Sequence, residues 1–197
     1  MLNDKFMLGV GQAHDMELAM QGTEWTTDDL KRFYSSRDLL NGALQVVRGT
    51  ATITPVEHII DCAADPFVPN SWTVETHQPG GLWKWNPEQV QFYLSTNQQN
   101  GKTIKGNKLR KELAGKPVLN ANVLDYLLKN PQLIPEEWKK DSNGNTRYIF
   151  FWGTIYRNAV GSLFVRYLYF NDGQWSWSHD WLDYAWGSYN PAALLAS

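Results

Sequence analysis

An alternation of aromatic and polar side chains near the C-terminal end constrains the fold more than any other feature. Three runs, 147–156, 163–170 and 174–181, are rich in Trp, Tyr and Phe, and Asn171-Asp172-Gly173 separates the last two. A period of two residues directs alternate side chains to opposite faces of a β-strand, and Asn, Asp and Gly favour tight turns. We therefore predict a three-stranded antiparallel meander at about 147–182, with at least one apolar face.

Helix patterns occupy the N-terminal part of the chain, at about 12–48. Thr26 and Asp29 have the spacing of an N-terminal capping box. Apolar residues from Leu40 to Val47 then repeat at helical spacing, and Gly49 follows them. Short amphipathic helices are marginal alone, so we expect these stripes to pack on an apolar surface elsewhere in the chain.

The middle of the chain contains further helix patterns. Asn86-Pro87 predicts a helix that continues through Leu94, a second is predicted from Lys105 to Ala114, and a third follows the cap residue Asn120 and ends before Pro131. One helical turn is expected at 135–138. The fold class that follows is α+β, with short amphipathic helices packed on an antiparallel sheet in a single domain over 1–197.

The signals between residues 49 and 85 are mixed. Thr73–His77 and Leu82–Trp85 read as strands, with Pro79-Gly80-Gly81 as a turn before the second. Residues 54–64 fit two structures equally well. Thr54–Glu57 matches a capping box with Pro55 at the first helical position, whereas the preceding β-branched residues favour a strand. The pattern leaves helix and strand open.

Charge and cysteine content limit the classes of partner. With 18 Lys and Arg against 20 Asp and Glu, the net charge is −2, which produces no long-range attraction to nucleic acid or anionic lipid. No apolar run approaches the roughly 18 residues that cross a bilayer, and residues 1–10 do not resemble a signal peptide. The single cysteine, Cys62, fits a reducing compartment. We expect no membrane association and a cytoplasmic location.

Cys62 also lies in the densest group of reactive side chains. If residues 58–65 are helical, His58, Asp61, Cys62 and Asp65 share one face. Cys62 with His58 or His77 is then the candidate nucleophile and base of a hydrolase. A lone cysteine is more often a small buried apolar residue, and this interpretation is favoured. The sequence does not visibly supply the ligands of a zinc site, so we predict neither a metal nor a cofactor.

A basic segment at 102–116 is the second candidate. It contains Lys102, Lys105, Lys108, Arg110, Lys111 and Lys116. On a helix, Lys108, Arg110 and Lys111 would lie away from the apolar face, where such a stripe neutralises phosphates. A solvated helix face is the favoured alternative because the rest of the chain is net acidic. We therefore expect no nucleic-acid complex at physiological salt.

Tryptophan pairs are the third candidate. The chain has 10 Trp, 9 Tyr and 8 Phe, and the pairs Trp83/Trp85 and Trp175/Trp177 each have the spacing that places both rings on one face of a strand. Exposed indoles bind sugar rings or apolar side chains of a partner, whereas buried ones belong to the core. The pattern favours the core and leaves open a binding surface for a protein or carbohydrate.

Three stretches resemble a known group of sequences. The segments GNKLRKEL (106–113), LNANVLDYLLKNPQLIPEEWK (119–139) and FFWGTIYR (150–157) resemble a recurrent family of small uncharacterised bacterial proteins. The resemblance extends over about 59–197. It implies no activity, and it assigns a role to no residue. Without a nucleophile–base motif, the sequence predicts a non-catalytic binding or interaction protein with an aromatic-rich surface. A Cys62-dependent hydrolase and a weak nucleic-acid binder are the alternatives.

Overall fold

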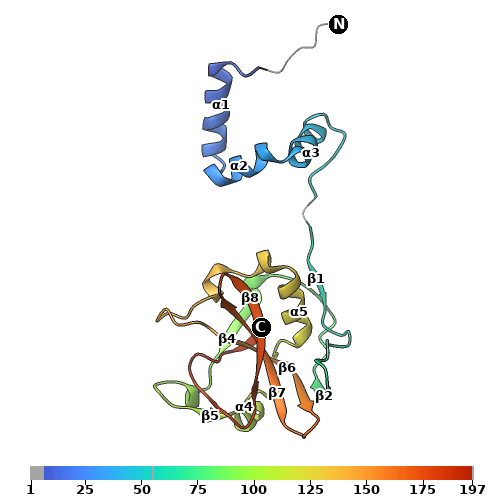
Figure 1. Ribbon diagram of the computed structural model, residues 1–197, viewed down its shortest axis with the longest axis vertical. Coiled ribbons are helices and arrows are strands. Elements are labelled where there is room, and N and C mark those ends of the chain that lie inside the picture. The colour runs from blue at the N-terminus through green and yellow to red at the C-terminus, as the bar shows by residue number, and fades with distance from the viewer. Residues whose placement is uncertain (1–6, 55, 197) are drawn as a thin grey trace. The chain divides into compact units, whose positions relative to one another are not determined.

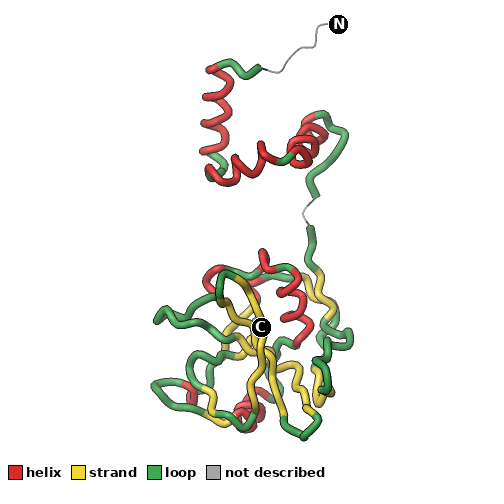
Figure 2. Tube along the Cα trace, in the orientation of Figure 1, coloured by secondary structure: helices red, strands yellow, loops and turns green. Residues whose placement is uncertain are grey.

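A computed structural model describes residues 7–54 and 56–196, which group into two compact units, Met1–Val56 and Glu57–Ser197. The single domain over 1–197 stays a prediction. Figure 2 shows no helix or strand among the described residues between α3, which ends at Val47, and β1, which begins at Ile59. The first six residues and Pro55, on which the signal-peptide and capping-box expectations partly rest, lie outside the described residues.

The described residues of the N-terminal unit form three helices, α1 (Val10–Gln21), α2 (Thr27–Ser35) and α3 (Arg37–Val47) (Figure 1). The capping box expected for α2 is confirmed, because the Thr26 hydroxyl accepts from the Asp29 amide and the Asp29 carboxylate accepts from the Thr26 amide. Trp25 packs edge-on against Phe33, with ring centroids 5.5 Å apart. None of the described residues in these helices is buried.

The C-terminal unit contains the remaining elements (Figure 1). Its strands are β1 (Ile59–Asp61), β2 (Trp72–His77), β3 (Leu82–Lys84), β4 (Val90–Tyr93), β5 (Ile104–Lys105), β6 (Ile149–Asn158), β7 (Leu163–Asn171), β8 (Gln174–Trp181), β9 (Ala185–Trp186) and β10 (Ala192–Leu195). Its helices are α4 (Gly106–Leu113) and α5 (Ala121–Lys129), with 3₁₀ turns at Pro87–Gln89, Thr96–Gln98, Pro131–Leu133 and Glu136–Trp138.

The fold class is α+β, as predicted, and β6, β7 and β8 form the expected aromatic-rich meander. Their pairing is antiparallel, and β7 and β8 run in continuous register from Phe164 opposite Trp181 to Asn171 opposite Gln174. The main sheet has the order β4-β10-β6-β7-β8, and β2 also pairs with β6. One contact departs from antiparallel pairing, because β10 lies parallel to β6 at Phe150.

Both faces of the sheet are covered, which explains why residues 149–156 of β6 are all buried. One face carries a core cluster that includes Ile149, Phe151 and Leu168 together with residues of α5. The other carries a second cluster in which Phe150 and Trp152 meet buried leucines of α4. Alternating residues of β6 therefore serve two separate cores, and a single substitution in this strand affects mainly one of them.

A register shift in β6 changes which side chains share a face. Phe150 is opposite Tyr167 and Ile155 is opposite Val165, so four residues of β6 face a single residue of β7 between these pairs. Strict alternation would send Trp152 and Ile155 to opposite faces, but both belong to the α4-side cluster. Gly153 lies in the shifted stretch, where a Cβ would come within 2.9 Å of Asn120.

The edge of β6 that faces β2 is divided between two partners. β2 pairs with residues 154–158, whereas β10 reaches β6 at Phe150. The segment before α5 lies between these two partners along the β6 edge. The Gly153 amide donates to Leu119 O (2.9 Å), and Val118 forms a β-bridge with Leu194. The sheet is therefore split at this edge.

The Asn120 side chain forms hydrogen bonds with three segments that lie at the split edge. Its Oδ1 caps α5 by accepting from the Asn122 amide (3.2 Å), and its Nδ2 donates to the carbonyl oxygens of Cys62 (2.8 Å) and Gln78 (2.9 Å). The residue is only 3% exposed. One side chain thus connects α5, the loop after β1 and the end of β2.

Two sequence expectations for this unit need correction. The helix predicted from Asn86 is wrong beyond its first turn, since Val90–Tyr93 is strand β4, paired with β10. The helical face that would group His58, Asp61 and Cys62 is also absent. Residues 59–61 form strand β1, in which Ile60 is buried opposite Trp83. The open question over 54–64 is thus resolved as strand for 59–61.

We expect Asn120→Ala to destabilise the protein by about 2–3 kcal/mol, because it removes a helix cap and two further hydrogen bonds at a buried position. Asn86→Ala is the matched control. Asn86 caps a 3₁₀ turn by accepting from the Glu88 amide, so its loss should cost less than about 1 kcal/mol. Urea unfolding of both variants measures the difference. Equal losses would contradict the connecting role of Asn120.

Candidate ligand-binding site

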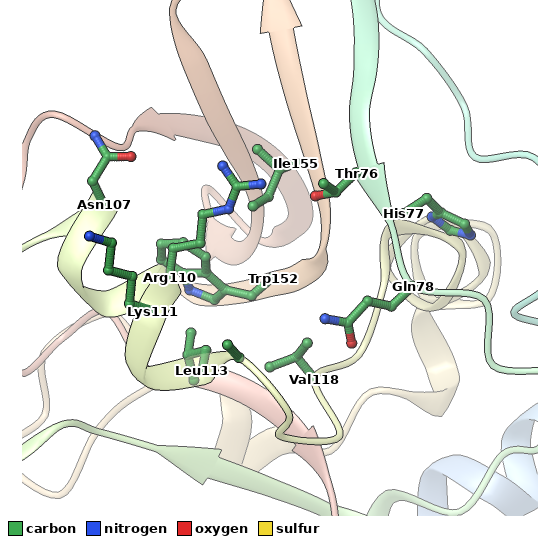
Figure 3. A pocket seen from close by; sticks show the side chains of 11 residues that line it. Thr76, His77, Gln78, Asn107, Arg110, Lys111, Leu113, Val118, Trp152 and Ile155 are labelled. Carbon is green, nitrogen blue, oxygen red and sulfur yellow. The ribbon is translucent and has the colours of Figure 1, made fainter.

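A cavity of about 770 Å³ lies at the split edge of the sheet (Figure 3). Figure 3 shows α4 on one side, the end of β2 on the other, and β6 behind them. The lining residues are Thr76, His77, Gln78, Asn107, Arg110, Lys111, Leu113, Ala114, Val118, Trp152 and Ile155. Its volume is within the range of about 300–1,000 Å³ that small-molecule sites occupy.

Helix α4 supplies the charged wall. Asn107, Arg110, Lys111 and Ala114 follow one another at i, i+3, i+4 and i+7, so they share the helix side that borders the cavity. Leu109 and Leu113 are buried and fix the helix against the sheet. Because the apolar stripe is anchored in the core, the position of Arg110 and Lys111 at the cavity follows from the helical period.

The two cations have no carboxylate partner among the described residues. All the salt bridges found among the described residues involve other side chains. Arg110 is half-buried, and Lys111 is exposed. Asn107 is already engaged, since its Nδ2 donates to Asp183 Oδ1 (2.8 Å). An anion entering the cavity therefore meets two positive charges that no described acid neutralises.

The opposite wall consists of residues 76–78 at the end of β2. No hydrogen bond joins the side chains of Thr76 or Gln78 to another described residue, and Figure 3 shows the Gln78 amide extended toward the cavity. His77 differs, because its Nδ1 is 2.8 Å from Thr154 Oγ1, and its ring is directed away from α4 in Figure 3. Thr76 and Gln78 thus offer a hydroxyl and an amide to a ligand.

The back wall contains a buried polar atom that has no hydrogen-bond partner among the described residues. Trp152 is 3% exposed, and its Nε1 makes no hydrogen bond within the described part of the chain. A buried donor without an acceptor costs roughly 1–3 kcal/mol and is uncommon in folded proteins. Such atoms are found where strain or function requires them, and here the atom belongs to a cavity-lining side chain.

The structure separates the three basic residues that the sequence groups together. Arg110 and Lys111 line the cavity, whereas Lys108 is exposed and does not. Lys105 donates to the carbonyl oxygen of Asp183 (2.8 Å), and Lys116 lies over the Tyr93 ring, 4.8 Å from its centroid. The segment is therefore not one uniform cationic stripe.

The candidate Cys62 nucleophile does not contact a base within the described residues. His58 Nδ1 lies 3.1 Å from the Tyr126 hydroxyl, and His77 bonds to Thr154. Asp61 accepts hydrogen bonds from the amides of Ala63 and Ala64. Burial, and to a smaller extent the neighbouring Asp61 charge, raise the pKa of the Cys62 thiol to about 11. At neutral pH the side chain is a thiol.

The first tryptophan pair lies in the core on the α5 side. Trp85 is buried, and Trp83 is partly buried against the same cluster. Their rings are 5.3 Å apart, and their indole nitrogens donate to Gln89 Oε1 and to Leu133 O. The expectation that both rings share a face is correct, and their polar atoms already have internal partners.

The second pair, Trp175 and Trp177, is also partly buried against this cluster. The Arg166 guanidinium lies 4.1 Å from the Trp177 ring centroid, and it forms a two-pronged ion pair with Asp125 at 2.6 and 3.0 Å. Arg166 is 1% exposed. Trp177 therefore has a structural role beside a buried charge.

The described residues contain no group of His, Cys, Asp and Glu side chains arranged to hold a metal ion. None of their helices combines the length and the apolar character that crossing a membrane requires. Comparison with protein-family models, with curated proteins and with solved structures finds no match.

Sequence reasoning found only part of the cavity. It singled out Arg110 and Lys111 by charge and His77 as a candidate base, but it missed Thr76, Gln78 and Trp152. Thr76 lies in β2, Gln78 directly follows it and Trp152 lies in β6, and the pairing of these two strands involves register shifts in both. No local pattern reports such a shift. The signal that does exist is Gly153, a small residue within an otherwise bulky strand.

We expect iodoacetamide to label Cys62 at neutral pH about 100-fold more slowly in the native protein than in the urea-unfolded chain, because the raised pKa lowers the thiolate fraction. The rate should rise with pH until the thiol titrates. Since Cys62 is the one cysteine in the sequence, all labelling reports this residue. Fast labelling of the native protein would instead support the nucleophile hypothesis.

Proposed function

We propose that the chain is a non-catalytic binding protein that holds an anionic ligand in the split-sheet cavity. One observation supports this above all. Arg110 and Lys111 line a cavity of about 770 Å³, and neither has a carboxylate partner among the described residues. Hydrogen bonds from charged donors to a carboxylate or phosphate are about twice as strong as neutral ones.

The polar groups around these cations favour a defined binding orientation. Arginine presents parallel N–H donors that match two oxygens of a carboxylate or phosphate, while lysine adds a flexible point charge. Thr76 and Gln78 lie on the opposite wall, at and just after the end of β2. Their side chains form no hydrogen bond with a described residue. Few polar groups in a mostly apolar cavity are the usual composition of a small-molecule site.

A non-catalytic role agrees with the state of the reactive side chains. The Cys62 thiol has a raised pKa, and both candidate histidines hydrogen-bond to hydroxyl groups. A hydrolase that uses Cys62 needs a thiolate and an oriented base. The contacts of these residues therefore favour binding over hydrolysis.

An aromatic contact surface remains part of the proposal, at a different place from the tryptophan pairs. Trp181 and Tyr184 are 42% and 50% exposed, with ring centroids 5.0 Å apart. They flank Asp183, which accepts from Asn107 on α4. We propose this pair as the contact for a protein or carbohydrate partner, since exposed aromatic rings suit both.

Two broader expectations also stay proposals. We propose a bacterial origin, on the resemblance noted in the sequence of 119–139 and 150–157. The free thiol of Cys62 is compatible with a reducing cytoplasmic location.

Isothermal titration with benzoate and with inorganic phosphate tests the binding site. We expect Arg110→Gln and Lys111→Gln each to weaken the bound anion about tenfold, because each removes one charge-assisted contact. Lys108→Gln is the control, since it removes the same charge from the same helix outside the cavity. Its affinity should change less than about twofold.

Two results would contradict the proposal. If neither anion binds, the cavity does not have the proposed function. If Lys108→Gln weakens binding as much as Arg110→Gln, the anion responds to the charge of the whole segment. Such a result, joined to a steep salt dependence of an RNA or DNA complex, would favour the nucleic-acid alternative.

A further inference from the structure

A second hollow adjoins the cavity. It has a volume of about 320 Å³ and shares the lining residues Gln78 and Val118 with the cavity. Its other lining residues are Cys62, Pro79, Gly80, Leu82, Trp83, Pro117, Leu119, Asn120 and Leu195. The two hollows therefore meet where the end of β2 approaches the segment before α5.

The two hollows differ in chemistry. Arg110 and Lys111 border the first, whereas no charged side chain lines the second. Apolar groups dominate the second hollow, and Leu82 on its wall is 76% exposed. An apolar side chain so accessible on a strand gains free energy when a ligand covers it.

Gln78 and Val118 form the boundary between the two hollows. The exposed Gln78 side chain makes no hydrogen bond with a described residue, whereas its backbone is fixed by donation to Gly153 O (2.7 Å) and acceptance from Asn120 Nδ2 (2.9 Å). The side chain can thus change rotamer while the strand stays in place. A chain-like ligand that passes this boundary would displace the Gln78 side chain and leave these backbone hydrogen bonds intact.

We propose that the ligand is a free amphipathic carboxylate, with its anionic head at Arg110 and Lys111 and an unbranched apolar chain that passes Gln78 into the hollow beside Leu82. This inference rests on the proposed anion site and adds the class of ligand. The positive charges of Arg110 and Lys111 favour an anionic head group, and the uncharged, mostly apolar second hollow favours an apolar chain.

Trp83 limits how the chain is seated. Its Nε1 is bonded to Gln89 Oε1 (3.1 Å), and its ring packs on Trp85. The indole therefore presents apolar atoms to the hollow, and it offers no free polar group to a ligand. Cys62 contributes a protonated thiol to the same hollow, which is also weakly polar. The second hollow thus favours methylene groups over a polar extension.

Titration with acetate, hexanoate and decanoate, the last below its micelle concentration, tests this inference. We expect the affinity to rise roughly fourfold for each methylene that becomes buried. Leu82→Thr should remove much of the gain for decanoate and leave acetate unchanged. The substitution keeps a strand-forming residue at a highly exposed position, so the fold should survive.

Ile59→Thr is the matched control. Ile59 lies on the neighbouring strand β1, is 42% exposed and does not line either hollow. The same chemical change there should leave the decanoate affinity unaltered. Arg110→Gln should weaken acetate and decanoate by the same factor, since both use one head.

The outcomes separate the two proposals. If the affinity depends on Arg110 but not on chain length, the anion site stands and the amphipathic ligand is wrong. If chain length matters but Leu82→Thr and Ile59→Thr have equal effects, the chain lies elsewhere and the inference is also wrong. Binding to phosphatidylglycerol vesicles through the same residues, without binding of monomeric decanoate, would replace the free ligand with a membrane surface. Absence of any Arg110-dependent binding overturns both proposals.

Discussion

Asn120 holds three segments of the C-terminal unit together through a single buried amide. Its Oδ1 caps α5, and its Nδ2 donates hydrogen bonds to the carbonyl oxygens of Cys62 and Gln78. Gly153 allows β6 to approach this side chain, since any Cβ there would collide with it. The end of β2 is therefore fixed in position although β10, and not β2, occupies the next part of the β6 edge. The cavity lies between this fixed end of β2 and helix α4, at the edge where the sheet is split.

Local patterns identified the elements that rest on local physics. Asn120 before α5, the apolar stripe of α4 and the aromatic alternation of β7 and β8 each follow from caps or periodicity. The helix predicted from Asn86 is wrong beyond its first turn because a distant strand determines the structure there. Asn86-Pro87 does start a helical turn, but Val90–Tyr93 gains a strand partner in β10, which lies about a hundred residues later in the sequence. Non-local pairing overrides a local start signal here.

The candidate site was only half accessible to sequence reasoning because its two walls have different origins. Arg110 and Lys111 follow from the helical period of α4 once Leu109 and Leu113 are placed in the core. Trp152 and Ile155 share a face because of the register shift in β6, which is a property of its pairing with β7. The tryptophan pairs show the converse. Their spacing predicts a common face, but only packing against the α5-side cluster determines that Trp85 is buried and the other three rings are partly buried.

The two faces of the sheet divide stability and binding between them. On the α5 side, Arg166 is neutralised by Asp125 and covered by Trp177, although its buried Nε has no hydrogen-bond partner among the described residues. On the α4 side, Arg110 and Lys111 border a cavity and have no such partner among the described residues. A buried cation without an acid would destabilise the fold, whereas one at a solvent-filled cavity remains hydrated until a ligand replaces the water. The net charge of −2 adds no long-range attraction. Recognition must therefore come from these local contacts, so replacement of either cation should matter more than a change in the total charge of the chain.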